Sequence, residues 1–354
     1  MSSLSRQGTR AAITQDSSVP VAVASALFAA GVTWALKPSR GRGKSSDTVL
    51  PKELVGVPYS EELELAIEVA LKGKFYLDLA RPRSLLFGSQ SSSQFVLITL
   101  AGDNIVMQTD AKGTAAEHLK KENGMDVDEQ NERIVVEAIR YIYPDHKIIG
   151  EPTDQGIVPE LTMAPTWIID PIDGTTNFDS GLPLTCVSIG FCVDGKSVMG
   201  VVYAPSTNEL YVGIRGHGAY RNAVRITCSN EVKKLSDAVV NFEFGYARSD
   251  VAQCVRNIMK NGVKTTRCLG SGVLDFCYVA TGRLDVVFAG AANEGWRPWD
   301  YCAAYVIVKE AGGAMESLLD QKPGEEFNLY GSSVVCATSQ TLLEETRRVC
   351  LGDM

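Results

Sequence analysis

Residues 167–178 read Trp-Ile-Ile-Asp-Pro-Ile-Asp-Gly-Thr-Thr-Asn-Phe. The apolar, β-branched start predicts a buried strand that ends in two carboxylates, Asp170 and Asp173. Pro171 stiffens the chain, and Gly174 followed by polar residues is typical of a turn that opens a helix. Two carboxylates and the carbonyl between them are hard oxygen ligands of the kind that Mg²⁺ prefers. A helix N-terminus behind them offers N–H groups to a phosphate. The stretch therefore indicates phosphoryl chemistry.

Composition sets the broad class of the protein. The chain has 354 residues, of which 45% are hydrophobic and 21% charged, and this is typical of one large globular domain or two closely packed ones. The net charge of −8 disfavours nucleic-acid binding, which usually needs a basic surface. It does not oppose a phosphate substrate, because a bound metal supplies positive charge locally.

The cysteines and histidines argue against a disulfide framework and against a zinc site. The nine cysteines all occur from Cys186 onward, their number is odd, and no Cys-x-x-Cys pair is present. Several lie in apolar runs, so we expect reduced, mostly buried thiols. The three histidines are scattered and give no zinc-site spacing.

The first fifty residues differ in composition from the rest of the chain. They are rich in Ser, Ala, Arg and Lys, and residues 20–36 form an uncharged apolar run that a basic cluster follows. An organellar targeting peptide, a single membrane anchor and a disordered leader all fit this pattern. Location in the cytoplasm or in an organelle stays open, and any membrane contact is expected only through residues 20–36.

The pattern of helices and strands predicted for the remaining chain divides it into two halves, residues 51–235 and 236–354. Helices are expected over 60–71 and 134–142, the second stopped by Pro144. After residue 235 strands and helices alternate, which suggests a sheet sandwiched between helices. Strands are expected at 146–150, 167–170, 185–193, 198–203, 210–213, 238–244, 265–269, 284–289 and 333–337. Further helices are expected near 249–261, 271–281, 300–311 and 339–349.

Acidic residues recur at the ends of these predicted elements. Glu151 follows one strand, Asp170 and Asp173 follow another, and Asp300 opens a helix. Each acid taken alone could be a turn residue or a helix N-cap. Taken together with the Gly-Thr-Thr turn, they favour a shared metal site.

The same segments resemble the inositol monophosphatase family, which belongs to a larger group of Mg²⁺-dependent, lithium-sensitive phosphatases. The resemblance covers roughly residues 60–350. It rests on Gly150-Glu151, on the run from Asp170 to Phe178, and on Trp299-Asp300 with the Glu310-Ala311-Gly312-Gly313 stretch. It implies an α+β fold, a layered αβαβα sandwich of the inositol monophosphatase and fructose bisphosphatase type, and usually a homodimer.

The resemblance also implies roles for individual residues. Thr175 matches a threonine that orients and activates a metal-bound water, and Gly174 and Thr175 match the phosphate-binding N–H groups. Glu294 resembles a carboxylate that accepts a substrate hydroxyl. The family's metal ligands correspond to Glu151, Asp170, the carbonyl of Ile172, Asp173 and Asp300, and its substrate contacts also to Gly270, Ser271, Gly272 and Asp300.

The implied activity is Mg²⁺-dependent hydrolysis of a small polyol or sugar monophosphate by water attack. No protein nucleophile is needed, and the spacing of Asp170 and Asp173 differs from the Asp-x-Asp-x-Thr pattern of phosphatases that use a nucleophilic Asp. Inositol monophosphate is the first candidate substrate. Histidinol phosphate, galactose 1-phosphate, fructose bisphosphate and phosphoadenosine phosphate are alternatives, and so is a non-catalytic binding relative.

Two segments depart from the family pattern. The acid-rich stretch before the second helix lacks the usual Thr-containing spacing, and Asp128 or Asn131 could stand at the acid that supports a third metal. Asp128 is therefore a candidate catalytic residue. Residues 83–120 look like extra length, either a surface loop or an error of the gene model.

Overall fold

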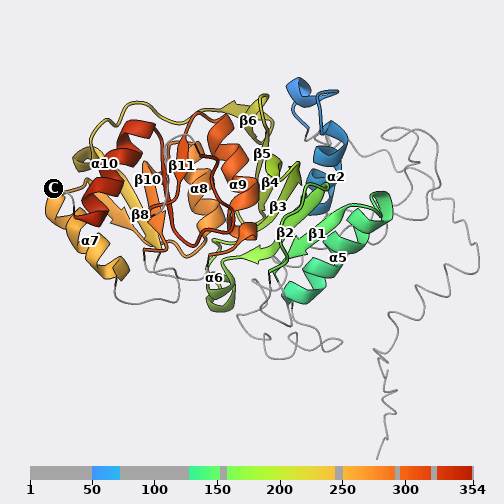
Figure 1. Cartoon of the computed structure of the whole chain (residues 1–354), viewed down its shortest axis with the longest axis horizontal. Helices are drawn as coiled ribbons and strands as arrows, with labels where there is room; N and C mark the ends of the chain where they lie inside the picture. Colours follow the sequence, from blue (N-terminus) through green and yellow to red (C-terminus); the bar gives the residue numbers. More distant parts are fainter. Residues whose placement is uncertain are drawn as a thin grey trace, which may run out of the picture. The chain divides into compact units, whose positions relative to one another are not determined.

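The computed structural model describes residues 50–71, 127–151, 158–243, 250–291, 296–319 and 325–352. All of them belong to one compact unit, Lys44–Leu79 with Phe95–Met354. Within this unit helices and sheets alternate in five layers (Figure 1). The predicted αβαβα sandwich is confirmed. The apolar run 20–36, the segment 83–120 and Glu294 lie outside the described residues.

The first sheet has seven strands in the order β1 to β7. β1 and β2 run parallel, and each later strand pairs antiparallel with the one before it. Asp194 and Gly195, both at positive φ, form the tight turn between β3 and β4, as their sequence predicts. β6 and β7 were not expected from the sequence. The strands are β1 (Lys147–Gly150), β2 (Thr166–Asp173), β3 (Cys186–Val193), β4 (Lys196–Ala204), β5 (Glu209–Ile214), β6 (Gly218–Arg221) and β7 (Val224–Ile226).

The second sheet has five strands in the order β11-β12-β10-β8-β9. β8 runs parallel to both β9 and β10, whereas β12 runs antiparallel to its two neighbours. The short β11 was not expected, and the predicted strand 265–269 ends earlier, at Arg267. The strands are β8 (Val239–Glu243), β9 (Thr265–Arg267), β10 (Val286–Ala289), β11 (Ala314–Glu316) and β12 (Val334–Ala337).

Helices cover both faces of both sheets. α2 (Ser60–Leu71) and α5 (Val127–Ile142) pack on the outer face of the first sheet, and α8 (Gly272–Ala280) and α9 (Pro298–Glu310) lie between the sheets. The outer face of the second sheet carries α7 (Asp250–Asn261) and α10 (Gln340–Leu351), and the short elements are α6 (Thr175–Ser180), η1 (Lys52–Leu54) and η3 (Leu235–Asp237). α5 and α9 both begin earlier than their apolar periodicity suggests, because polar and proline-containing first turns precede the apolar residues.

Three glycines allow α9 to lie very close to the first sheet. Gly190, Gly200 and Gly213 are partners in adjacent strands, so they form a row across β3, β4 and β5. A Cβ at Gly200 would stand 2.2 Å from the carbonyl oxygen of Ala303, and one at Gly190 would stand 2.3 Å from Cys302 Sγ. Side chains here would force α9 away from the sheet.

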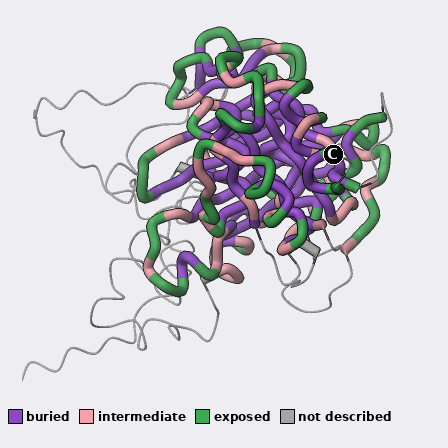
Figure 2. Tube along the Cα trace, turned by 90° about the vertical axis from the view of Figure 1, so that its left-hand side faces the viewer, coloured by how far each residue is buried: buried purple, intermediate pink, exposed green. Residues whose placement is uncertain are grey.

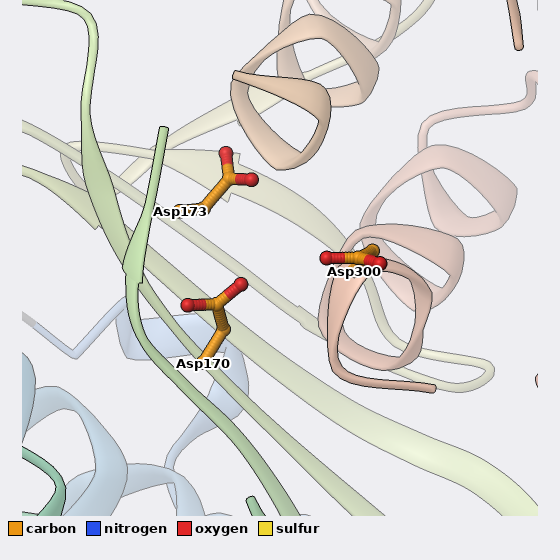
Figure 3. Close-up of side chains that lie close together, drawn as sticks. All are labelled: Asp170, Asp173 and Asp300. Atoms are coloured by element: carbon orange, nitrogen blue, oxygen red, sulfur yellow. The ribbon is translucent and has the colours of Figure 1, made fainter. Parts of the chain in front are cut away.

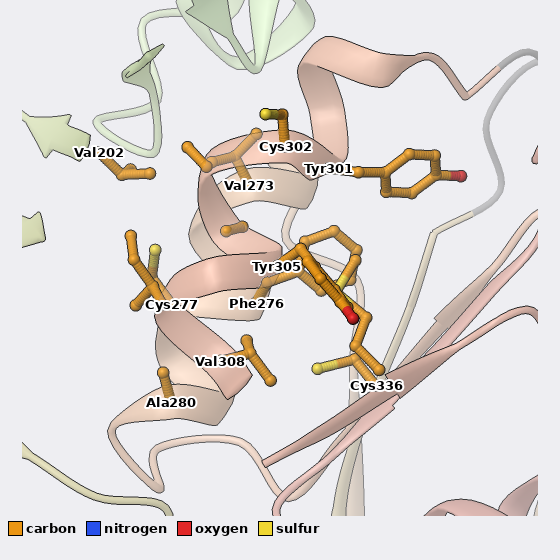
Figure 4. Packing of buried hydrophobic residues seen from close by; sticks show 14 of the residues in the cluster. Val202, Val273, Phe276, Cys277, Ala280, Tyr301, Cys302, Tyr305, Val308 and Cys336 are labelled. Atoms are coloured by element: carbon orange, nitrogen blue, oxygen red, sulfur yellow. The ribbon is translucent and has the colours of Figure 1, made fainter. Parts of the chain in front are cut away.

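Three apolar cores hold the layers together. One core joins α2 and α5 to the first sheet, one surrounds α8 and α9, and one joins the second sheet to α7 and α10. Figure 2 shows buried residues concentrated in the interior and exposed ones in the loops. Figure 4 shows the core around α8 and α9, where Phe276, Cys277 and Tyr301 pack among small and β-branched side chains.

All nine cysteines are unpaired, as expected. Cys268 is exposed and the other eight are buried. Among the described residues no helix combines the length and apolar character needed to span a membrane.

Candidate active site

Three aspartates from two distant segments meet between the first sheet and α9. Asp170 and Asp173 come from β2 and Asp300 from α9, and one carboxylate oxygen from each lies within 4.8 Å of the others. Figure 3 shows the three side chains turned into the same space. The sequence predicts that all three belong to one metal site, and the fold brings their side chains together.

The end of β2 is built differently from the prediction. The strand does not stop at Asp170 but continues to Asp173, with a shift of register between the two. Pro171 has no N–H to donate to the ladder, so the pairing with β3 is interrupted here and a bulge forms. The carbonyl of Ile172, a predicted ligand, lies within this interruption.

Asp300 occupies the first turn of α9. The helix begins at Pro298 rather than at Asp300, and Arg297 is its N-cap. Asp300 Oδ2 accepts a hydrogen bond from the Arg297 backbone N–H at 2.7 Å, which makes a capping box. The first turn of the helix therefore fixes the direction of this carboxylate.

Each of the three carboxylates has one oxygen held by the protein. Asp170 Oδ1 accepts from the Ile172 N–H at 3.1 Å, and Asp173 Oδ2 accepts from the Val273 N–H at 3.1 Å and from the Ser271 hydroxyl. The second oxygen of each side chain takes no hydrogen bond from the described residues. One oxygen orients the group, and the other is available to a ligand.

Burial and mutual repulsion raise the pKa of each carboxyl. Asp170 has its pKa raised well above the usual range, first by burial and then by the charges of Asp173, Asp300, Glu151 and Asp128. Burial also raises the pKa of Asp300, and it raises that of Asp173 to about 6 although the Ser271 and Val273 hydrogen bonds oppose the shift. Such a cluster of like charges is stable in its ionised form only with cations nearby.

Glu151 stands beside the three aspartates rather than among them. It follows β1, which pairs with β2, and its charge raises the pKa of both Asp170 and Asp300. It is not part of the group of oxygens within 4.8 Å of one another. Its own pKa is raised by desolvation.

The first turns of α5 carry Asp128 and Asn131, the two candidates for the residue that supports a third metal. Asp128 is half-buried, and its charge acts on Asp170. Asn131 is fully buried, and its amide donates to the Pro171 carbonyl at 3.5 Å. Glu132 was not predicted as a site residue, and a Cβ on Gly150 would stand 2.7 Å from its carboxylate oxygen.

The predicted phosphate-binding and substrate-binding segments lie against each other. Gly174 is the N-cap of α6, at φ 87°, and a Cβ there would stand 3.2 Å from the Cβ of Ser271. Ser271 caps α8 and donates to Asp173, so the Gly270-Ser271-Gly272 segment is tied to the aspartates. Thr175 is the first residue of α6 and is half-buried. Asn177, whose amide donates to the Leu269 carbonyl at 2.7 Å, was not predicted as a site residue.

The residues present fit a hard divalent cation. All the charged donors are carboxylates, and three of them are within reach of one ion. Burial and the neighbouring acids raise the pKa of each carboxyl, and a cation would oppose this shift. Among the described residues, no histidine or cysteine belongs to the cluster, which argues against zinc.

Comparison with known proteins identifies this architecture. The profile of the Inositol monophosphatase family matches residues 93–350. The chain belongs to the inositol monophosphatase family. Inositol monophosphatase 1 of Solanum lycopersicum is 37% identical over 225 residues, which cover 62% of this chain and 79% of that protein.

Other relatives show the same family relationship. The Nus factor SuhB of Pasteurella multocida is 36% identical over 232 residues, covering 64% of this chain and 83% of that protein. A solved inositol monophosphatase structure from Thermotoga maritima superposes with a TM-score of 0.58 at 30% identity, and the match covers 71% of this chain and 92% of that one. As a member of the inositol monophosphatase family the chain is a phosphoric monoester hydrolase, and the three clustered aspartates could hold the metal ion of a metal-dependent phosphatase.

Proposed function

We propose that this protein is a Mg²⁺-dependent phosphatase that hydrolyses inositol monophosphate or a similar small polyol or sugar phosphate. The observation that carries the proposal is the set of three aspartates, two buried and one half-buried, each with one oxygen held by the protein and one available. Oxygen-only donor sets favour Mg²⁺ over softer metals.

The aspartates and Glu151 would hold the metal, together with the Ile172 carbonyl. Bound Mg²⁺ would neutralise the phosphate and lower the pKa of a water. The backbone of Gly174 and Thr175 would hold the phosphate oxygens at the start of α6. We propose that the Thr175 hydroxyl and Glu151 orient the water that attacks phosphorus, with Asp128 in support.

The 270–272 segment would contact the substrate ring, and Glu294 would accept one of its hydroxyls. Because Ser271 is bonded to Asp173, substrate contacts and metal ligands form one rigid unit. A homodimer is part of the proposal and can be checked by light scattering.

The experiment is release of inorganic phosphate by the full chain, with and without Mg²⁺. The substrates are inositol 1-phosphate, histidinol phosphate, galactose 1-phosphate, fructose 1,6-bisphosphate and phosphoadenosine phosphate. We expect release only with Mg²⁺ and fastest from inositol 1-phosphate, with at least a hundredfold loss in Asp170→Asn because a metal ligand is lost.

Asp194→Asn is a matched control. Asp194 is an exposed turn residue at φ 51°, a conformation that Asn also adopts, so this variant should keep full activity. Unchanged activity in Asp170→Asn would refute the metal assignment. If the folded protein releases phosphate from none of the substrates, the result would instead favour a non-catalytic binding relative.

A further inference from the structure

A second buried acidic cluster lies next to the active site, behind the substrate segment. It consists of Asn241 and Glu243 on β8 and Asp275 on α8, and all three side chains are buried. None of them takes part in an ion pair with a described residue, and none is a predicted metal ligand. The loop that connects β9 to α8, residues 268–271, passes over the cluster; we call it the 268–271 loop.

Glu243 holds the backbone of this loop. Its Oε1 accepts hydrogen bonds from the N–H groups of Leu269 and Gly270, both at 2.9 Å. The Asn241 amide donates to the same oxygen at 3.1 Å, and Cys268 Sγ lies 3.8 Å from Oε2. A single carboxylate therefore collects donors from consecutive residues of the loop, which is a strong arrangement because the acceptor is charged.

Asp275 is linked to Glu243 through the Asn241 side chain. Asn241 bridges the two acids, since its amide nitrogen also donates to Asp275 Oδ2 at 2.8 Å. Burial, followed by the Glu243 charge, raises the pKa of Asp275 well above its usual range. The Asn241 amide therefore holds both acids in place.

The opposite side of the 268–271 loop is held by Asn177. Asn177 donates to the Leu269 carbonyl, and a Cβ on Gly270 would stand 2.9 Å from Asn177 Oδ1. Beyond the loop, a Cβ on Gly272 would stand 2.3 Å from the ring of Trp296. The loop thus fits between α6 and β8, with Ser271 hydrogen-bonded to Asp173 and Trp296 packed on Gly272 just beyond the loop.

We propose that Glu243 is a positioning residue for the substrate segment, with Asn241 linking it to Asp275. The role is distinct from that of the metal ligands, because Glu243 acts through the backbone of Leu269 and Gly270. The inference rests on the proposed function only in assigning the 270–272 segment to the substrate. The hydrogen-bond network itself is independent of that assignment.

The test compares two substitutions at Glu243. Glu243→Gln keeps an acceptor oxygen for the Leu269 and Gly270 N–H groups, so it should behave as the parent. Glu243→Ala removes the acceptor. We expect KM for inositol 1-phosphate to rise about tenfold or more with a smaller change in kcat, since misplaced binding groups weaken substrate binding.

A second readout does not need activity. Amide hydrogen exchange at Leu269 and Gly270 should be at least about tenfold faster in Glu243→Ala than in Glu243→Gln, while exchange in α10 stays unchanged. Equal exchange rates in the two variants would overturn the proposal even if the enzyme is active. Faster exchange in a protein that hydrolyses none of the substrates would support the positioning role and reject the proposed function.

Asp275 is tested in the same way and covers the case in which Glu243→Ala does not fold. Asp275→Asn keeps an acceptor oxygen for the Asn241 amide, so KM and loop exchange should match the parent. Asp275→Leu removes this acceptor and should reproduce the loosened loop. If Asp275→Asn raises KM as strongly as Asp275→Leu, the support of Glu243 through Asn241 and Asp275 is refuted.

Discussion

Gly200 of β4 lies directly against Ala303 of α9. A Cβ on the glycine would stand 2.2 Å from the Ala303 carbonyl oxygen and 2.7 Å from its Cα. This contact sets the distance between the first sheet and the helix that carries Asp300. Since the other two aspartates of the cluster belong to β2 of the same sheet, the glycine indirectly sets the separation of the three carboxylates.

Gly200→Ala should therefore disturb both stability and metal binding. Overpacking against backbone costs about 1–3 kcal/mol, and we expect the upper end because a helix backbone cannot rotate away as a side chain can. Urea unfolding and the Mg²⁺ dependence of phosphate release measure the two effects. Gly213→Ala is the control, since its Cβ would stand 3.3 Å from Ile307 Cα and should cost less. Equal stability of the two variants would contradict this account of the glycine row.

Mg²⁺ should stabilise the folded protein, because the ionised cluster forms only in the native state. At a concentration about 100 times the dissociation constant, the gain in unfolding free energy is about 2.7 kcal/mol. Thermal unfolding with Mg²⁺ and with EDTA measures it. The gain should disappear in Asp300→Asn and persist in Asp194→Asn. If the melting temperature of the parent is the same with Mg²⁺ and with EDTA, the result would argue against the proposed metal site.

Asp128 and Asn131 should affect different properties. Asp128 acts on Asp170 through its charge, so Asp128→Asn should weaken the apparent Mg²⁺ affinity by about tenfold with little loss of stability. Asn131 is buried and holds the Pro171 carbonyl, so Asn131→Ala should cost about 1 kcal/mol and leave the affinity near that of the parent. Mg²⁺ titrations of phosphate release and urea unfolding separate the effects. The reverse pattern would make Asn131 the metal-supporting residue.

Asn177→Asp should be destabilising although it is isosteric. The amide nitrogen donates to the carbonyls of Leu184, at 3.0 Å, and Leu269, at 2.7 Å. A carboxylate would place a negative charge against both oxygens and leave them without a donor, at a cost of about 1–3 kcal/mol. Asn177→Ala lacks the repulsion and should lose less. Urea unfolding compares the two variants, and equal stability would contradict the predicted repulsion.

His146 should make stability depend on pH. Its Nδ1 accepts from the Trp167 indole N–H at 3.1 Å, and its ring stacks on Tyr143, so the neutral form is favoured and burial lowers the pKa. The folded pKa lies below the unfolded value near 6.5. The contribution of His146 is therefore complete above pH 6.5 and is lost as the pH falls through the folded pKa.

The matched variant is His146→Phe, which keeps a ring in the stack but cannot titrate. The stability advantage of the parent over this variant should shrink between pH 7.5 and pH 5.5 in urea unfolding. An advantage that is constant over this range would show that His146 does not change its protonation state there.

Several elements were predictable because their signals are local. The alternation of strands and helices after residue 235, the turn at Asp194-Gly195 and the helix over 60–71 all follow from short-range pattern. The ends of β2 and α9 were not predicted correctly. A bulge at Pro171 and a capping box at Arg297 depend on pairing and capping partners, which periodicity does not report.

The sequence by itself determined the chemistry of the site. Asp170, Asp173, Glu151 and Asp300 stand at element ends, and hard oxygen donors beside a Gly-Thr turn are recognisable without coordinates. Tertiary structure decided how these groups are held. The glycine row, the Asn177 and Glu243 contacts on one loop, and the placement of Asp128 join residues far apart in the chain. Such contacts arise only when helices pack on sheets, because close packing, not local propensity, selects them.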